Sequence, residues 1–220
     1  MGENTNRSYM RAKRRRIHES IYLVEFPTQY QLAATFLRFQ EYYESKRFHG
    51  RVFSLEEYMD WYAKQYGNFT YYEDWSGFNI PSAVLKPFRE GQFDPLLRKE
   101  RELLDLFADR TDDFYIVGVT GNGGGIDPDT TKHELAHALF NTHDVYRTAV
   151  RRKLREYDTS KIKRLLEDHG YWKHVLEDEV HAYLLTNDST IPAAMRKTFR
   201  PLSRELRRLY RRHASEITIQ

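Results

Sequence analysis

Residues 130–143, TTKHELAHALFNTH, place two histidines and a glutamate at a spacing that an α-helix brings onto one face. His137 follows His133 by four residues, so the two rings lie one helical turn apart. Two imidazole nitrogens in this arrangement can bind one metal ion, and the carboxylate of Glu134 lies beside them to polarise a bound water. The segment therefore predicts a helix that supports metal-assisted hydrolysis.

The residues that surround these three side chains are uncharged helix formers, namely Leu135, Ala136, Ala138 and Leu139. They can pack against a core, so the predicted metal site belongs to a buried element. Because uncharged residues surround its two histidines and its glutamate, the segment resembles the HExxH helix of the zincin metallopeptidases. The resemblance implies a zinc-dependent peptidase with an α+β, zincin-like fold. Such a fold has a small, mostly antiparallel or mixed sheet, an active-site helix and a helical C-terminal part.

Catalytic zinc usually takes three protein ligands, so the two histidines need a third. Glu179 is the preferred residue, because its segment is similar to the second ligand helix of the gluzincin peptidases. In that arrangement a small residue follows the glutamate by three positions and a polar residue by four, as Ala182 and Tyr183 do here. The resemblance implies that His133, His137 and Glu179 hold one Zn²⁺ per chain.

Two other residues are alternative third ligands. His143 stands ten residues after His133, which is the spacing of the third histidine in metzincin peptidases. However, Phe140 occupies the position at which that motif has a glycine to turn the chain. Glu177 shares a different helical face with His181, one turn away, and could also serve. The sequence leaves these alternatives open.

The reaction predicted from these residues is hydrolysis of a peptide bond by a metal-activated water. Glu134 is the candidate general base, which takes a proton from the water and delivers it to the leaving amine. Tyr183 is the first candidate for a second donor to the oxyanion, with Tyr146 and His181 as further candidates. The expected substrate is a protein or peptide.

Two alternatives belong to other functional classes. Glu134-x-x-His137 is also a Glu-x-x-His motif, and Asp178-x-x-His181 repeats it with Asp in place of Glu. Two such helices could form a carboxylate-bridged di-iron site and act as a metal-dependent oxidase, if other helices supplied further carboxylates. The second alternative is a non-catalytic zinc-binding interaction protein with basic tails.

Length and composition favour one domain. The chain has 220 residues, of which 40% are hydrophobic, and can bury one sizeable core. The absence of cysteine excludes disulfides and thiolate zinc sites, which leaves His and carboxylate side chains as metal ligands. No stretch is apolar enough for a membrane span or a secretory signal, so we expect a cytoplasmic protein without a membrane partner.

Both ends of the chain are basic. Residues 1–18 are polar and include a basic run at 11–16, so we expect a flexible tail before a single metallopeptidase domain at 19–220. Near the C-terminus, arginines recur between 204 and 212 on a predicted helix. The basic termini could contact nucleic acid, although the net charge of +3 would make such contacts local.

Periodicity and turn signals predict the other elements. They predict strands at 21–26, 69–72 and 114–120, and helices at 28–45, 55–66, 94–110 and 172–186. The strand at 114–120 directly precedes the HExxH helix, so we expect it at the sheet edge above the cleft, where it could bind an extended peptide. The segment 74–81 is predicted to be an ordered loop, and Asp129 or Thr130 to be the N-cap of the HExxH helix.

Overall fold

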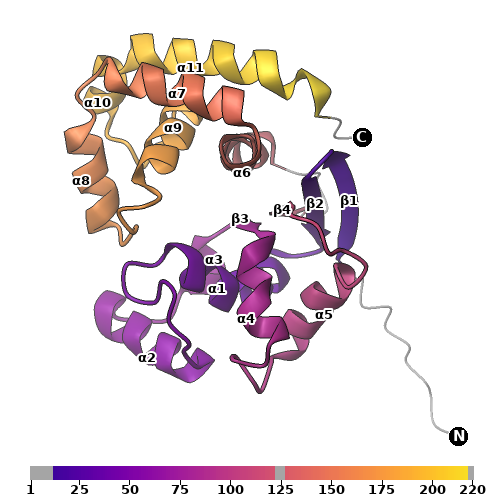
Figure 1. Cartoon of the computed structure of the whole chain (residues 1–220). Coiled ribbons are helices and arrows are strands. Elements are labelled where there is room, and N and C mark those ends of the chain that lie inside the picture. The colour runs from indigo at the N-terminus through magenta and orange to yellow at the C-terminus, as the bar shows by residue number, and fades with distance from the viewer. Residues whose placement is uncertain (1–11, 122–126, 218–220) are drawn as a thin grey trace, which may run out of the picture.

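A four-stranded mixed sheet lies between two layers of helices in the computed structural model, which describes residues 12–121 and 127–217 (Figure 1). The strands are β1 (Lys13–His18), β2 (Ile21–Phe26), β3 (Gly77–Pro81) and β4 (Tyr115–Thr120). Their order is β1-β2-β4-β3. β2 and β4 run parallel, whereas β1 pairs antiparallel with β2 and β3 with β4. The predicted α+β class with a small mixed sheet is confirmed.

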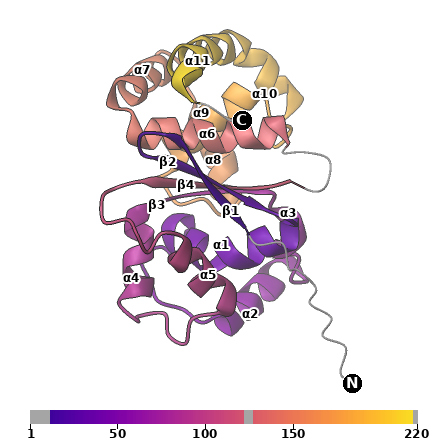
Figure 2. The ribbon, with the colours of Figure 1, turned by 90° about the vertical axis from the view of Figure 1, so that its right-hand side faces the viewer.

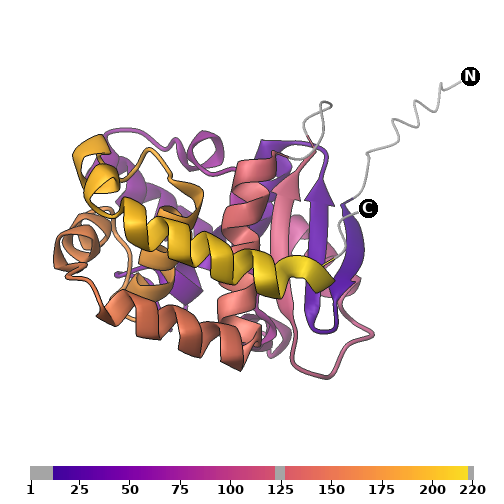
Figure 3. The same ribbon diagram turned by 90° about the horizontal axis from the view of Figure 1, so that it is seen from above.

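The helices that precede β4 cover one face of the sheet, and those that follow it cover the other (Figure 2). The first layer contains α1 (Gln29–Glu44), α2 (Leu55–Tyr66), α3 (Tyr71–Asp74), α4 (Leu85–Arg89) and α5 (Arg98–Leu106). The second contains α6 (Pro128–Thr142), α7 (Asp144–Arg155), α8 (Ser160–Asp168), α9 (Leu176–Thr186), α10 (Ala193–Thr198) and α11 (Arg200–His213). Figure 3 shows α6 beside the strands and α7 alongside α11. No helix within the described ranges is both long and apolar enough to cross a membrane.

Each face of the sheet contributes to a separate hydrophobic core. Leu23 and Val117 point into the core under α6 and α9, whereas Val24 and Ile116 point into the core over α1. This follows from the alternation of side chains along a strand, which directs neighbouring residues to opposite faces. Since both faces are covered, β2 and β4 are almost continuously buried, as central strands of such a sheet should be.

The N-caps agree with two predicted helix starts and correct a third. Thr28 and Ser54 begin α1 and α2, and each accepts a hydrogen bond from the backbone NH three residues further on. In α6 the cap is Asp127, whereas Asp129 or Thr130 was predicted. The Asp127 carboxylate accepts a hydrogen bond from the backbone NH of Thr130 at 2.7 Å, so the helix begins two to three residues earlier than predicted.

The predicted position of the edge strand is wrong. β4 pairs with strands on both sides, and all of its residues are buried. The edge position belongs to β3, which lies in the segment that was predicted to be a loop. Its short sequence begins with Gly77 and ends with Pro81, and both residue types weaken the pattern of a strand. Conversely, the strand predicted at 69–72 is absent, because α3 begins at Tyr71. The β-propensity of aromatic residues reflects packing more than backbone preference.

Part of the predicted N-terminal tail is a strand. Residues 13–18 form β1, in which Ile17 is buried. Arg14 forms an ion pair with Asp109, 2.6 Å away, and its guanidinium lies over the ring of Tyr22. Basic side chains are common on the outermost strand of a sheet because they discourage pairing with other chains. The rest of the predicted tail, residues 1–11, lies outside the described residues.

Candidate metal centre

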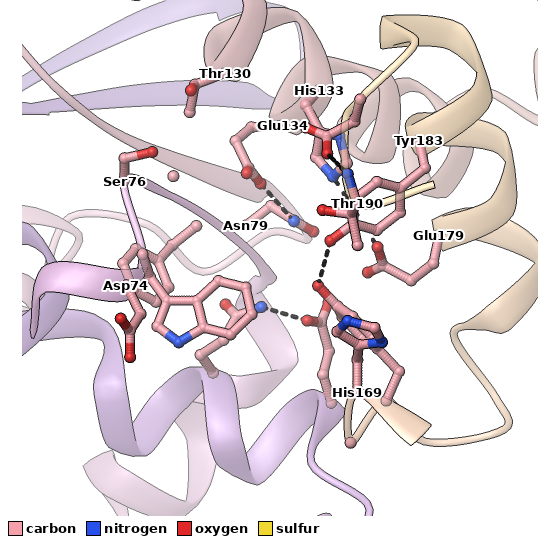
Figure 4. Close-up of a pocket in the computed structure, with 18 of the residues that line it drawn as sticks. Asp74, Ser76, Asn79, Thr130, His133, Glu134, His169, Glu179, Tyr183 and Thr190 are labelled. Carbon is pink, nitrogen blue, oxygen red and sulfur yellow. Dashed lines mark hydrogen bonds and ion pairs between the residues drawn. The ribbon is translucent and has the colours of Figure 1, made fainter. Parts of the chain in front are cut away.

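α6 and α9 pack against each other and bring three side chains together in one cleft (Figure 4). His133 and His137 lie one turn apart on α6, and Glu179 reaches them from the first turn of α9. The Oε2 atom of Glu179 lies 4.0 Å from Nε2 of His133 and 3.7 Å from Nε2 of His137. All three ligand atoms lie within 4.8 Å of one another. This group could therefore hold a metal ion.

The environment of Glu179 fits a cation at this position. The residue is 2% exposed, and its Oε2 atom has no hydrogen-bond partner within the described chain. Burial raises the pKa of Glu179 to about 8, because a buried charge without a partner is costly. A bound cation would supply that partner. Two imidazoles and one carboxylate are also a donor set of catalytic zinc sites, which leave a position open for water.

The two histidines differ in their surroundings. Burial lowers the pKa of His133 well below its usual value, which keeps the ring neutral, as metal ligation requires. Burial acts in the same direction on His137, but the charges of Asp178 and Glu179 outweigh it and raise the pKa of His137. The negative charge around His137 favours a positive charge at this point, whether a proton or a metal ion supplies it.

Asp178 holds His137 on the side of the ring that faces away from Glu179. Its Oδ1 atom lies 3.0 Å from Nδ1 of His137, whereas Nε2 of the same ring faces Glu179. Burial disfavours the charged carboxylate, but the charges of His137 and His181 and the hydrogen bonds from both rings together outweigh it and lower the pKa of Asp178 to about 2. A carboxylate in this place fixes the tautomer of a ligand histidine and directs its other nitrogen at the metal. The sequence assigned Asp178 only to the di-iron alternative.

We expect Asp178→Asn to weaken zinc binding by about 10- to 100-fold, the usual effect of changing such a supporting residue. The amide keeps the size of the side chain but loses the charge that stabilises the ring of His137 in its ligand orientation. Zinc titration against a chromophoric chelator measures the change. Glu177→Gln, which alters the preceding carboxylate of α9, is the control and should keep the wild-type affinity. Equal affinities for the two variants would contradict this role of Asp178.

β3 positions the third residue of the motif, Glu134. The amide of Asn79 donates a hydrogen bond to Oε2 of Glu134 at 2.7 Å, and both residues are buried. Burial raises the pKa of Glu134, while the charge of His137 and the bond from Asn79 oppose this shift. The strand also leaves space for the carboxylate, because a Cβ atom at Gly77 would lie 2.5 Å from Oε1 of Glu134. A larger residue at position 77 would displace Glu134.

Buried hydrogen bonds continue from Asn79 to Asp178. The hydroxyl of Tyr115 donates to Oδ1 of Asn79 at 2.6 Å. The amide of Asn141 donates to the Tyr115 hydroxyl at 3.2 Å and to Oδ2 of Asp178 at 2.8 Å. The two ends of this chain of bonds hold the glutamate and the second histidine of the motif. Such a network fixes the relative positions of its members when every polar group is satisfied.

Tyr183 lies in the same cleft, next to the metal-binding group. Its ring packs edge-on against His133, with centroids 4.8 Å apart, and its hydroxyl lies 2.9 Å from that of Tyr171. The other two predicted oxyanion donors do not line the cleft. They contact each other instead, with the hydroxyl of Tyr146 at 2.7 Å from Nε2 of His181.

The alternative third ligands lie apart from the two histidines. His143 ends α6 and caps α7, where its Nδ1 atom accepts a hydrogen bond from the backbone NH of Tyr146. Glu177 forms an ion pair with Arg151 and is 38% exposed. Residues two positions apart on a helix point about 200° away from each other, so Glu177 and Glu179 cannot both face α6. Of the three predicted candidates, only Glu179 joins the histidines.

The di-iron alternative requires His181 at the same centre as His137. The ring of His181 stacks on Phe140, with centroids 5.5 Å apart, and contacts Tyr146, and its Nδ1 atom lies 3.5 Å from Oδ1 of Asp178, but it does not belong to the group that could hold an ion. Across the described residues, the group of His133, His137 and Glu179 is the only set of three or more such side chains that could hold one ion. The geometry thus favours a single-ion site over a bridged pair.

The cleft around this group has a volume of about 870 Å³. The first helical layer and β3 form one wall, and α6 and α9 form the other. Six consecutive residues, 74–79, line it, and the last three belong to the edge strand β3, so β3 borders the cleft. In Figure 4, Glu134 points toward Asn79, while Glu179 and Tyr183 come from the facing helix.

Comparisons of the chain with protein-family models, with curated proteins and with solved structures find no match. The function is therefore inferred from the geometry of the site. The zincin-like fold and the peptidase activity that the motif implies remain predictions.

Proposed function

We propose that this protein is a zinc-dependent metalloendopeptidase that hydrolyses peptide bonds in proteins or peptides. The observation that carries the proposal is the convergence of His133, His137 and Glu179 in one cleft, with Glu134 beside them. These three residues would hold the zinc ion. Bound zinc would lower the pKa of a water molecule and polarise the carbonyl of the substrate.

Glu134 is the general base in this proposal. Its carboxylate, held by Asn79, accepts a proton from the attacking water and then gives it to the leaving amine. Burial raises the pKa of Glu134, which makes its carboxylate a stronger proton acceptor. Tyr183 lies beside His133, where its hydroxyl can donate a hydrogen bond to the developing oxyanion.

The outer edge of β3 is the proposed binding surface for the substrate backbone. An edge strand has NH and C=O groups that are not paired within the sheet, and an extended peptide can add to it as a further strand. Because residues 76–79 border the cleft, a peptide bound there would pass the Glu134 carboxylate. This role was predicted for the strand at 114–120, which is an inner strand.

We expect the purified protein to contain about one zinc ion per chain and to hydrolyse an unfolded protein such as casein. Removing the zinc with a chelator should abolish hydrolysis, and adding zinc back should restore it. Elemental analysis and gel electrophoresis of the digest measure the two properties. Two iron ions per chain would favour the oxidase alternative instead. Full zinc occupancy without hydrolysis of any unfolded substrate would favour the non-catalytic alternative.

A further inference from the structure

Acidic residues dominate the lining of the cleft, although the chain as a whole is slightly basic. The protein has a formal net charge of +3, yet seven carboxylates line the cleft besides Glu134 and Glu179. They are Glu41, Glu44, Asp74, Asp127, Asp129, Asp168 and Asp188. Among the described residues that line the cleft, Arg196 is the one Lys or Arg, and it donates a hydrogen bond to the backbone oxygen of Asn187. A cleft of one sign concentrates its field and attracts ligands of the opposite charge.

Glu44, on α1, is a buried carboxylate without a cationic partner. It is 9% exposed, and its side chain accepts a hydrogen bond from the amide of Gln40. The carbonyl oxygen of that amide is itself buried and has no donor within the described chain. Buried carboxylates are normally paired, because an isolated one loses its hydration without compensation. Both side chains line the cleft, so a ligand can supply the missing positive group.

Glu100, in the same helical layer, is a buried carboxylate that is paired with a cation of the protein. It is 1% exposed and forms a two-point ion pair with Arg38, whose Nε atom lies 2.6 Å from Oε1. Neither Glu41 nor Glu44 forms an ion pair with a Lys or Arg in the part of the chain that the structure describes. The two cleft carboxylates are therefore not needed to neutralise a buried cation of the protein.

Aromatic rings form the wall around Glu41. Tyr58 and Tyr71 are 2% and 1% exposed, and with Trp75 they line the same part of the cleft. Burial raises the pKa of Glu41 to about 7, against the effect of the Tyr58 and Tyr71 hydroxyls. The ring of Trp75 is partly exposed, and an exposed aromatic face attracts a cationic head group and packs against the aliphatic part of a Lys or Arg side chain. This part of the cleft therefore has both a carboxylate and an aromatic surface, the two features that bind a Lys or Arg side chain.

The carboxylates of the cleft extend from the metal-binding group to the far side of the pocket, because Glu44 is close enough to Glu179 for the charge of Glu179 to raise the pKa of Glu44. In Figure 4, Asp74 lies on the opposite side of the pocket from Glu179 and Tyr183, with Glu134 between them. Asp74 is held in place by the hydroxyl of Tyr62, which donates to it at 2.5 Å. A peptide that passes Glu134 along β3 can therefore place a neighbouring side chain against Glu41 and Glu44.

We infer that the cleft selects peptide segments that carry Lys or Arg close to the bond to be cleaved, with the cationic side chain bound by Glu41 and Glu44. This inference rests on the proposed peptidase function, because the metal-binding group marks the point of cleavage. An acidic cleft repels phosphate groups, which argues against nucleic acid as its ligand. The unpaired edge of β3 favours a peptide over a free polyamine.

Binding can be tested without hydrolysis on the zinc-loaded Glu134→Gln protein. Fluorescent alanine-rich peptides that differ only in a central pair of residues, lysine, norleucine or glutamate, are compared by anisotropy. The lysine peptide should bind about tenfold more tightly than the norleucine peptide, and the glutamate peptide most weakly. Added salt should reduce the difference in affinity between the lysine and norleucine peptides, because it screens the charge interaction. Equal affinities for the lysine and norleucine peptides would overturn the inference.

The responsible residues are tested by Glu41→Gln and Glu44→Gln in the same background. Each should reduce the ratio of lysine to norleucine affinity several-fold, because a neutral amide replaces a charge. Glu56→Gln is the matched control, since Glu56 is an exposed carboxylate on α2 that does not line the cleft. An unchanged ratio in both cleft variants would overturn the assignment, and folding is checked by circular dichroism.

The cleavage products of the wild-type enzyme separate this inference from the proposed function. Mass spectrometry of a casein digest should find Lys or Arg enriched next to the cleaved bonds. Hydrolysis without such enrichment would overturn the substrate preference and leave the peptidase function standing. Charge-dependent binding without hydrolysis would support the inferred ligand class and contradict the peptidase function.

Discussion

Glu134→Gln is expected to abolish peptide hydrolysis while zinc content and folding stay nearly unchanged. Glutamine has the shape of glutamate, and its carbonyl oxygen can still accept the hydrogen bond that Asn79 donates at 2.7 Å. It cannot take a proton from the attacking water. Removing a general base typically lowers the rate by a factor of about 10² to 10⁴, so we expect a loss of at least about 10²-fold in kcat.

The measurement is the rate of hydrolysis of a fluorogenic peptide, with zinc content determined on the same sample. Glu177→Gln is the control, because Glu177 lies on another face of α9 and pairs with Arg151. It should keep the wild-type rate. A fully active Glu134→Gln protein would show that Glu134 is not the base. A variant that loses its zinc would show that Glu134 acts on the metal site instead.

The motif on α6 could be predicted because its geometry is local. Four residues of helix place His133 and His137 on one face whatever the rest of the chain does. The caps Thr28 and Ser54 are equally local, since each bonds a backbone NH three residues away. Such interactions can be predicted from the sequence because the interacting groups are already neighbours in the chain.

The hydrogen bonds that hold the site residues in place could not be predicted in the same way, because they join distant parts of the chain. Asn79 and Glu134 are 55 residues apart in sequence, and Tyr115 and Asn79 are 36 apart. The edge position of β3 depends on its pairing with β4, which no pattern within Gly77–Pro81 specifies. One signal was present, since Asn79 is a polar residue between Phe78 and Ile80. A polar side chain in a buried strand needs a specific partner.

The sequence does not assign Asp178 to the zinc site, for a geometric reason. It directly precedes Glu179, and adjacent helical residues point about 100° apart, so a single ligand face does not include both. The two carboxylates reach His137 from different sides, at 3.0 Å from Nδ1 and 3.7 Å from Nε2. One short segment of α9 therefore provides a carboxylate next to each ring nitrogen of His137. The pair Asp178-Glu179 explains how a histidine on another helix is held in a single orientation.

Glu179→Ala is expected to remove most of the zinc affinity, because it takes away the ligand that α9 contributes. The change should exceed the loss of about 10- to 100-fold expected when a supporting residue is altered. Thermal unfolding gives a second measurement, since a ligand that binds the folded state raises its melting temperature. Zinc should raise the melting temperature of the wild type and have little effect on Glu179→Ala.

Two control variants test the choice of Glu179 over the other candidates. Glu177→Ala changes a carboxylate two residues earlier, which pairs with Arg151 and faces about 200° away from Glu179. His143→Ala removes the cap of α7 and should lower stability by about 1 kcal/mol without changing zinc affinity. Both should therefore bind zinc like the wild type. The opposite pattern, with zinc lost in His143→Ala and retained in Glu179→Ala, would make His143 the third ligand and require the chain to turn after His137, where α6 is continuous to Thr142.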